Sequence, residues 1–251
     1  MTQSDKARSF KSLHLKGTPL VLYNIWDAGS AKTVASAGAK AIATGSWSVA
    51  AAQGYPDGQA IPMEFALQIV ERITQAVDVP VTVDFEGGYT TDPADLTVHV
   101  ERLIAAGAIG LNLEDQVVGG VGLHSIADQT ARLRAVRSAA LNSGIQVFLN
   151  ARTDLFLKAN AADHATLMDE TLARAAAYAN AGADGFFVPG LTDLTLIRQL
   201  AAKITLPLNA MMVGELTSEA LASAGVARIS YGPGPYRRAQ EDLTRRCGLL
   251  S

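Results

Sequence analysis

The chain has 251 residues, of which 49% are hydrophobic and 18% charged, so it can bury a large core and is typical of a soluble globular protein. A formal net charge of −3 and the lack of any run of lysine and arginine argue against nucleic acid as a partner. No segment has the apolar length of a signal peptide or a membrane span, and the single cysteine, Cys247, permits no internal disulfide. We therefore expect a cytoplasmic protein that does not bind membranes.

Eight apolar runs of strand length follow one another along the chain. They are continuously apolar, as buried parallel strands are, rather than alternating. In chain order they are PLVLYNIW (19–26), AIATGS (41–46), VPVTVDFE (79–86), IGLNLED (109–115), QVFLNARTD (146–154), GFFVPG (185–190), LPLNAMM (206–212) and ARISYG (227–232).

Amphipathic stretches between these runs predict helices, several of which end at a glycine. They cover residues 30–38, 62–77, 93–107, 127–144, 167–182 and 216–225. Strict alternation of strands and helices predicts a parallel sheet, and eight such units match the usual size of a (β/α)8 TIM barrel. We predict one barrel domain over residues 1–251, preceded by a short N-terminal helix.

Active sites of such barrels lie at the C-terminal ends of the strands, where this chain places charged residues. Asp84 and Glu86 close the third run, and Glu114 closes the fourth. Neighbouring carboxylates repel one another unless they share a cation, so this cluster predicts a divalent metal site. The alternative is that one or two of the three cap a helix or pair with Arg152.

Arg152 is the only basic residue at the ends of the third to fifth runs. Its guanidinium could hold a substrate carboxylate through two hydrogen bonds, or neutralise Glu114 or Asp154. No lysine occurs from residue 41 to 157 or in the sixth run, so a Schiff-base aldolase has no obvious nucleophile at these strand ends.

Three weaker candidates lie in the loops that follow the strands. Backbone amides of Gly45, Ser46 and Trp47, in the loop after the second run, could hold an anionic group. Asp57 could reach the metal or simply form a turn. His124 could move a proton or be solvated.

The motifs together resemble those of the isocitrate lyase and phosphoenolpyruvate mutase superfamily, in its short, phosphonomutase-like members. The resemblance rests on WDAGSA, TGSW, GYPDG, VDFEGGY, LEDQ, NARTD, AGADGFFVPG and GVARISYGPGPYR, which occur in the expected order over nearly the whole chain. It implies a barrel that uses Mg2+, or alternatively Mn2+, and acts on small 2-oxo or 2-hydroxy carboxylates. It also implies a homotetramer in which paired subunits exchange the C-terminal helix.

The resemblance also assigns roles to residues of the site. It implies that Asp84 ligates Mg2+ directly, and that Glu86 and Glu114 do so through water. Asp57 would orient metal and substrate, and Arg152 would steady the carboxylate and the reacting bond. The loop of Gly45, Ser46 and Trp47 would bind the anionic end of the substrate.

One departure from the family pattern concerns the loop after LEDQ. Lyases of the family carry KKCGH or KRCGH there, with a cysteine that acts as acid or base, whereas this chain has VVGGVGLHS. Mutases carry a longer loop with Lys and Asn. We therefore expect neither isocitrate-type cleavage by the usual route nor phosphoenolpyruvate mutation.

A lyase that breaks a C–C or C–P bond in an oxaloacetate-like acid, through a metal-stabilised enolate, is the leading hypothesis. The mechanism would use Arg152, Glu114 and Asp57, with a proton from water or His124. Three alternatives stay open: a hydrolase of a C–C or C–P bond, a phosphonomutase, and a barrel that binds a dicarboxylate without turnover.

Overall fold

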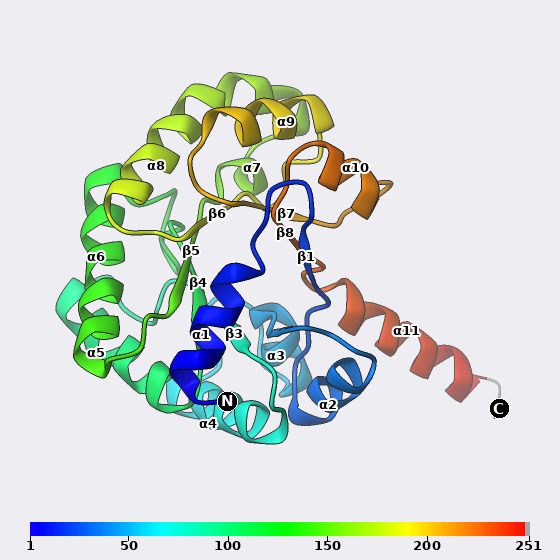
Figure 1. The fold of residues 1–251 in the computed structure, drawn as a ribbon. Coiled ribbons are helices and arrows are strands. Elements are labelled where there is room, and N and C mark those ends of the chain that lie inside the picture. Colours follow the sequence, from blue (N-terminus) through cyan, green and yellow to red (C-terminus); the bar gives the residue numbers. More distant parts are fainter. Residues whose placement is uncertain (249–251) are drawn as a thin grey trace.

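Eight parallel strands form one sheet that curves into a nearly closed barrel with the helices outside it (Figure 1). The computed structural model describes residues 1–248, so the last three residues of the predicted domain lie outside the described part. The strands are β1 (Leu20–Leu22), β2 (Ile42–Ala43), β3 (Val81–Asp84), β4 (Gly110–Glu114), β5 (Phe148–Arg152), β6 (Gly185–Phe187), β7 (Leu208–Met211) and β8 (Arg228–Ser230).

The barrel closes between its first and second strands just beyond β1. From β2 to β8 each strand pairs with its sequence neighbours, and β8 pairs with β1. Ile25 N donates to Ala43 O at 2.9 Å, and Gly45 N donates to Ile25 O at 3.1 Å. The predicted (β/α)8 barrel is confirmed, and each of the eight predicted runs contains one observed strand.

Helices connect the strands and surround the barrel. They are α1 (Gln3–Ser12), α2 (Ala28–Ser36), α3 (Ser46–Ala52), α4 (Met63–Ala76), α5 (Pro93–Ala105), α6 (Ile126–Ser143), α7 (Leu155–Lys158), the 3-10 helix η1 (Ala161–Leu167), α8 (Met168–Asn180), α9 (Leu194–Lys203), α10 (Ser218–Ser223) and α11 (Gly234–Gly248). The short helices α7 and η1 were not predicted, and two longer differences concern α3 and α9. The stretch predicted as a loop after β2 begins with α3, and α9 is missing from the helices predicted above.

Helix α5 illustrates how the sequence builds these outer elements. Asp92 caps its N-terminus by accepting from the amides of the first turn, and a proline opens the helix. Leu96, Val100 and Leu103 recur at helical spacing, and all three are buried in the core cluster that also contains Leu111 of β4. Burial of this face against the sheet fixes the helix on the outside of the barrel.

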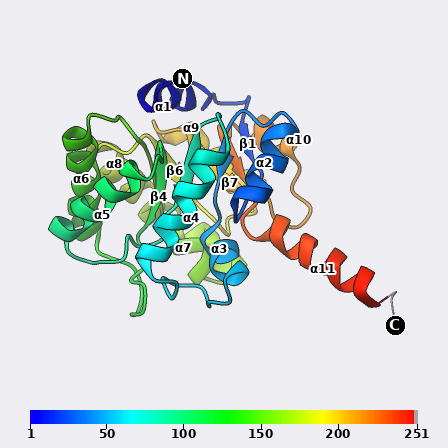
Figure 2. The same ribbon diagram turned by 90° about the horizontal axis from the view of Figure 1, so that it is seen from below.

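Helix α1 covers the end of the barrel at which the strands begin (Figure 2). The Gln3 amide donates to Ile104 O in the last turn of α5 at 2.8 Å and to Ala108 O in the α5–β4 connection at 3.0 Å. Phe10 is buried and packs edge-on against Phe148 of β5. His14 stacks on the same ring at 4.0 Å and donates through Nδ1 to Phe10 O, if that nitrogen carries the proton. The predicted N-terminal helix therefore serves as a plug for the barrel.

His14 should make the stability of the protein depend on pH. Burial, followed by the charge of Arg228, lowers the pKa of His14 to about 3, while Asp184 opposes the decrease. Between pH 6.5 and about 3 the unfolded chain binds a proton here that the folded chain does not, so stability falls as pH falls. At pH 5 the loss relative to pH 7 should be about 2 kcal/mol. Urea unfolding of the wild type and of His14→Leu at pH 7 and pH 5 checks this, because the variant should lack this part of the pH dependence. An equal loss of unfolding free energy between the two pH values in both proteins would contradict the prediction.

Helix α11 runs away from the barrel instead of packing on it (Figures 1 and 2). Among its described residues only Pro235 is buried, and Leu243 is 56% exposed. Cys247 is free and exposed. In residues 1–248 there is no helix with the length and apolar character needed to cross a membrane.

Candidate active site

A cavity of about 210 Å3 lies at the C-terminal ends of the strands. Each of the eight strands, or the residues directly after it, contributes to the lining. The lining residues are Asn24, Gly45, Ser46, Trp47, Asp57, Asp84, Asn112, Arg152, Leu157, Phe187, Pro189, Met211, Ser230, Gly232 and Pro233. Asp84, Arg152, Asp57 and the Gly45–Trp47 segment therefore meet around one cavity, as expected for a barrel active site.

Asp84 is held from both neighbouring strands. Its Oδ2 accepts from Ser46 N at 3.2 Å and Ser46 Oγ at 2.7 Å, and its Oδ1 accepts from Asn112 Nδ2 at 3.1 Å. Its own backbone N donates to Thr44 Oγ1 at 2.9 Å. Donors on both carboxylate oxygens fix the direction in which the carboxylate points.

The Ser46 amide belongs to the first turn of α3 and is directed at Asp84. It was predicted to hold the anionic end of a substrate, but in the structure it supports a carboxylate of the protein. Gly45 and Trp47 line the cavity on either side of it. The guanidinium of Arg237, a residue of α11, lies over the Trp47 ring, 4.7 Å from the ring centroid.

Arg152 links the carboxylates of three strands. Its Nε and Nη2 donate to the two carboxylate oxygens of Asp154 at 2.6 and 2.9 Å, a bidentate pair. Its Nη1 lies 3.0 Å from Glu114 Oε2 and 3.7 Å from Asp84 Oδ1. Burial alone would lower the pKa of Arg152, but the charges of Glu114, Asp154 and Asp84 raise it above its ordinary value. Both roles considered for this residue are therefore compatible, because it neutralises the site and also lines the cavity.

Glu86 and Glu114 are not among the residues that line the cavity, and each is only 5% exposed. Burial, together with the charges of Asp84 and Asp57, raises the pKa of Glu86 to about 8. Burial also raises the pKa of Glu114, and the Arg152 guanidinium opposes that rise. Glu86 Oε2 is buried with no hydrogen-bond partner in the described chain. A buried carboxylate oxygen without a donor is suited to a cation or to a water that a cation holds.

The backbone around Glu86 is strained. Within residues 1–248, the non-glycine residues with positive φ are Gln59 at 59°, Glu86 at 50° and Tyr89 at 61°. These three residues are connected, because Gln59 Oε1 accepts from Tyr89 N at 2.7 Å and a backbone hydrogen bond from Gln59 stabilises the charged form of Glu86. Strain of this kind persists where the surrounding structure enforces it, commonly at functional sites.

The three predicted metal ligands do not form one close group of direct ligands. In residues 1–248, no three His, Cys, Asp or Glu side chains lie close enough together to hold one ion between them. Asp84 lines the cavity, whereas Glu86 and Glu114 do not. This arrangement suits direct ligation by Asp84 alone, with the other two acting through water, and metal binding stays a prediction.

The loop after β4 is anchored at its two ends. Asp115 accepts from Tyr178 Oη at 2.8 Å and Arg174 Nη1 at 3.1 Å, and its carbonyl accepts from His124 N at 2.7 Å. Val121, at the tip, is 97% exposed. His124 does not line the cavity, so its proposed part in proton transfer has no support from this arrangement.

Sequence reasoning missed several residues of the cavity. Asn24 follows β1, Ser230 ends β8 and Asn112 lies within β4, and in each case a polar residue in an apolar run was the available signal. The apolar wall opposite the carboxylates gave no signal, because its residues look like ordinary core. It consists of Leu157, Phe187, Pro189, Met211 and Pro233.

Comparison with known proteins assigns the chain to a family. Residues 10–250 match the family model described as phosphoenolpyruvate phosphomutase. The chain belongs to the phosphoenolpyruvate phosphomutase family. It is thus a member of the isocitrate lyase and PEP mutase superfamily, and its homologues there are enzymes.

Solved and curated relatives support the same assignment. A protein of Burkholderia cenocepacia J2315, provisionally named a phosphonomutase, is 49% identical, and its crystal structure superposes with a TM-score of 0.97 over 100% of both chains. The 2-methylisocitrate lyase of Escherichia coli K12 is 28% identical, over 94% of this chain and 81% of its own length. Oxaloacetate decarboxylase 1 of Pseudomonas fluorescens Pf0-1 is 29% identical, over 94% of this chain and 81% of its own length. These relatives carry out different reactions, so the family alone does not assign the reaction of this chain.

Proposed function

We propose that the protein is an Mg2+-dependent carbon–carbon lyase that removes CO2 from an oxaloacetate-like 2-oxo acid. The single observation that supports this most strongly is the composition of the cavity lining. Within the described residues, the charged side chains that line it are Asp57, Asp84 and Arg152, with no lysine, histidine, cysteine or tyrosine among the lining residues. Decarboxylation of a 2-oxo acid needs an electron sink and no base to begin, whereas cleavage of a 2-hydroxy acid needs a base for its hydroxyl group, for which this lining offers only carboxylates.

The oxygen-rich side chains fit a hard divalent cation. Asp84 would hold Mg2+ directly, and Glu86, with its unpartnered Oε2, and Glu114 would hold waters around it. Mn2+, which accepts the same ligands, is the alternative ion. When bound, the ion would polarise the carbonyl oxygen of the substrate and stabilise the negative charge that develops there.

The residues of the chain would orient the acid for bond cleavage. Arg152 would steady the carboxylate next to the carbonyl, and Asp57 at the rim would help to place substrate and metal. The departing carboxylate would lie against the apolar wall that contains Phe187 and Met211. A carboxylate in such surroundings loses hydration that neutral CO2 does not need, so cleavage is favoured. The electron pair of the broken bond remains on the substrate as the pyruvate enolate, which a proton from water converts to pyruvate.

The test is turnover by the purified full chain with Mg2+ or Mn2+. The panel contains oxaloacetate, alkylmalates, phosphonopyruvate and 2-methylisocitrate. Pyruvate and CO2 from oxaloacetate would support the proposal, and oxalate and acetate would instead indicate a hydrolase. Turnover of phosphonopyruvate alone would indicate C–P chemistry. Tight binding of a dicarboxylate without any product would identify a binding protein and refute the proposal.

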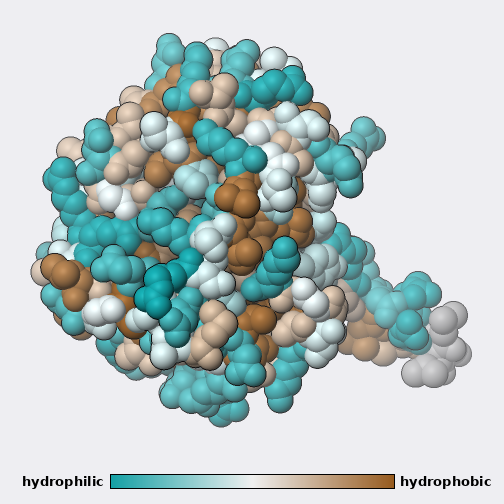
Figure 3. All heavy atoms as spheres, viewed as in Figure 1, coloured by the Kyte–Doolittle hydropathy of each residue, from teal (hydrophilic) through white to brown (hydrophobic). Residues whose placement is uncertain are grey.

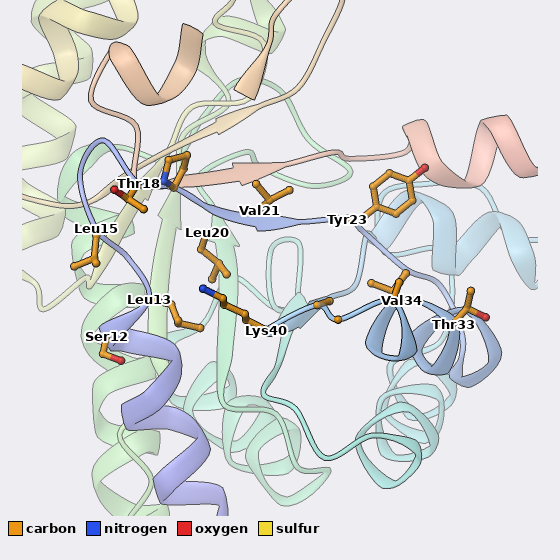
Figure 4. A pocket seen from close by; sticks show the side chains of 14 residues that line it. Ser12, Leu13, Leu15, Thr18, Leu20, Val21, Tyr23, Thr33, Val34 and Lys40 are labelled. Carbon is orange, nitrogen blue, oxygen red and sulfur yellow. The ribbon is translucent and has the colours of Figure 1, made fainter. Parts of the chain in front are cut away.

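We also propose that α11 packs on a second copy of this chain within a homo-oligomer, a tetramer built from exchanged pairs. In a (β/α)8 barrel the helix after β8 would cover the outside of β8 and β1. Here α11 turns away, and Val21 of β1 and Tyr23, which follows β1, remain 43% and 40% exposed. An apolar patch lies over this part of the surface (Figure 3), and a groove of about 640 Å3 runs between β1, the end of α1 and α2 (Figure 4). Ala239 and Leu243 recur at helical spacing on α11 and supply a complementary apolar stripe.

Light scattering of the full chain tests this assembly. We expect an oligomer for the wild type, and dissociation for Leu243→Asp, because a charge would be buried in the groove. Thr244→Asp places the same charge on the neighbouring face of α11 and should leave the oligomer intact. A monomeric wild type, or equal behaviour of both variants, would contradict the exchange.

A further inference from the structure

Arg228 is a buried cation without a counter-ion inside the barrel. It lies in β8, is 1% exposed, and makes no ion pair with any described residue. Its Nε and Nη1 have no hydrogen-bond partner in the described part of the chain. The guanidinium carbon lies 5.9 Å from the Phe10 ring centroid. Burial lowers the pKa of Arg228 to about 9, an effect that the charge of Asp84 opposes.

Two other buried arginines make more hydrogen bonds than Arg228, although Arg132 also lacks an ion pair and its Nε has no partner in residues 1–248. Arg174 pairs with Asp115 and Glu170. Arg132 donates to the carbonyl oxygens of Gly87, Thr90 and Glu114. A buried charge with unmatched donors destabilises a fold, and an apolar side chain of similar volume is often more stable in its place. Arg228 therefore calls for an explanation other than stability.

Within residues 1–248, Arg228 makes one side-chain hydrogen bond, which leads toward the active site. Its Nη2 donates to Asn112 Oδ1 at 3.2 Å, and Asn150 Nδ2 donates to the same oxygen at 2.9 Å. Two donors on Oδ1 determine which way the amide faces, because an amide nitrogen in that place would meet two N–H groups. The nitrogen of Asn112 is thereby turned to Asp84, whose Oδ1 accepts from it at 3.1 Å.

We propose that Arg228 is a positioning residue, which fixes the Asn112 amide so that Asp84 presents its carboxylate to the cavity in one orientation. This inference rests on the proposed function, because it assumes that Asp84 is the residue that ligates the metal. Partners that orient a metal ligand typically contribute about 10- to 100-fold to metal affinity or activity. The buried charge of Arg228 would thus lower the stability of the fold but keep the Asp84 carboxylate in the orientation that metal binding needs.

Arg228→Met and Arg228→Lys separate this role from a purely electrostatic one. Both side chains have nearly the length of arginine, but only lysine retains a donor for Asn112 Oδ1. If Arg228 acted only through its charge, its loss would strengthen binding of a cation nearby. Under our proposal Arg228→Met should instead weaken Mn2+ binding by at least about 10-fold, and Arg228→Lys should keep it within about threefold of the wild type.

The measurements are Mn2+ titration of the full chain by calorimetry, urea unfolding, and crystal structures of both variants. Arg228→Met should be at least as stable as the wild type, so its weaker binding cannot come from misfolding. Its crystal structure should show that Asn150 alone does not hold the Asn112 amide, so that the Asn112–Asp84 hydrogen bond is lost, while the lysine variant retains it. Unchanged or tighter Mn2+ binding by Arg228→Met, with that hydrogen bond intact, would overturn the proposal. If the wild type bound no Mn2+, the metal role of Asp84 would fail, and the two crystal structures would still decide whether Arg228 orients Asn112.

Discussion

Replacing Asp84 by asparagine should abolish both turnover and binding of a divalent cation. Asparagine has the shape of aspartate but lacks the charge. It also cannot accept three hydrogen bonds in the same place, because its amide nitrogen would face a donor, either Ser46 N or Asn112 Nδ2. Asn112 cannot turn to accept, since Arg228 and Asn150 hold its oxygen.

We expect kcat/KM of Asp84→Asn to fall by at least about 1,000-fold, on the order of 4 kcal/mol of transition-state stabilisation. Turnover of the substrate that the panel identifies gives the rate, and calorimetry with Mn2+ gives the affinity. Glu215→Gln is the matched control, since Glu215 is an exposed carboxylate in the loop after β7, at the same end of the barrel. Appreciable activity in Asp84→Asn would remove this residue from the metal site.

The sequence contained enough information to predict the barrel and the position of its site. Apolar runs long enough to be strands, separated by helical periodicity, determine a parallel sheet, and the charged residues that end the runs are then brought to one end of it. For this reason Asp84 and Arg152 could be placed around one cavity before any coordinates were known.

Features that depend on pairing across the barrel could not be predicted in this way. Asn112 and Arg228 lie within strands, and their hydrogen bond joins residues 116 positions apart. Helix α3 was missed because its seven residues are small or apolar and show no clear amphipathic pattern. The direction of the Ser46 amide follows from that helix, so its contact with Asp84 was missed as well.

Arg152→Lys should reduce kcat by about 100-fold, on the order of 2.7 kcal/mol. Arginine donates to both oxygens of Asp154 and still places Nη1 3.0 Å from Glu114, whereas a single ammonium group cannot reach both partners with the same geometry. A lysine that paired with Asp154 would leave the cavity wall, and one that pointed at the substrate would leave Asp154 without its bidentate partner. Arg152→Met would test the chemistry less well. Loss of the charge at residue 152 would leave buried carboxylates unpaired and lower the free energy of unfolding by roughly 3 to 5 kcal/mol.

Arg137→Lys is the control for this substitution, since it changes an arginine of comparable burial outside the cavity. Arg137 pairs with Asp184 and donates to Gly182 O and Val147 O. Its replacement should lower the urea midpoint and leave kcat unchanged. If Arg152→Lys behaved in the same way, with lower stability and full kcat, Arg152 would act only as the counter-ion of Glu114 and Asp154. A loss of kcat at nearly unchanged stability would instead mean that the planar guanidinium is needed in the transition state.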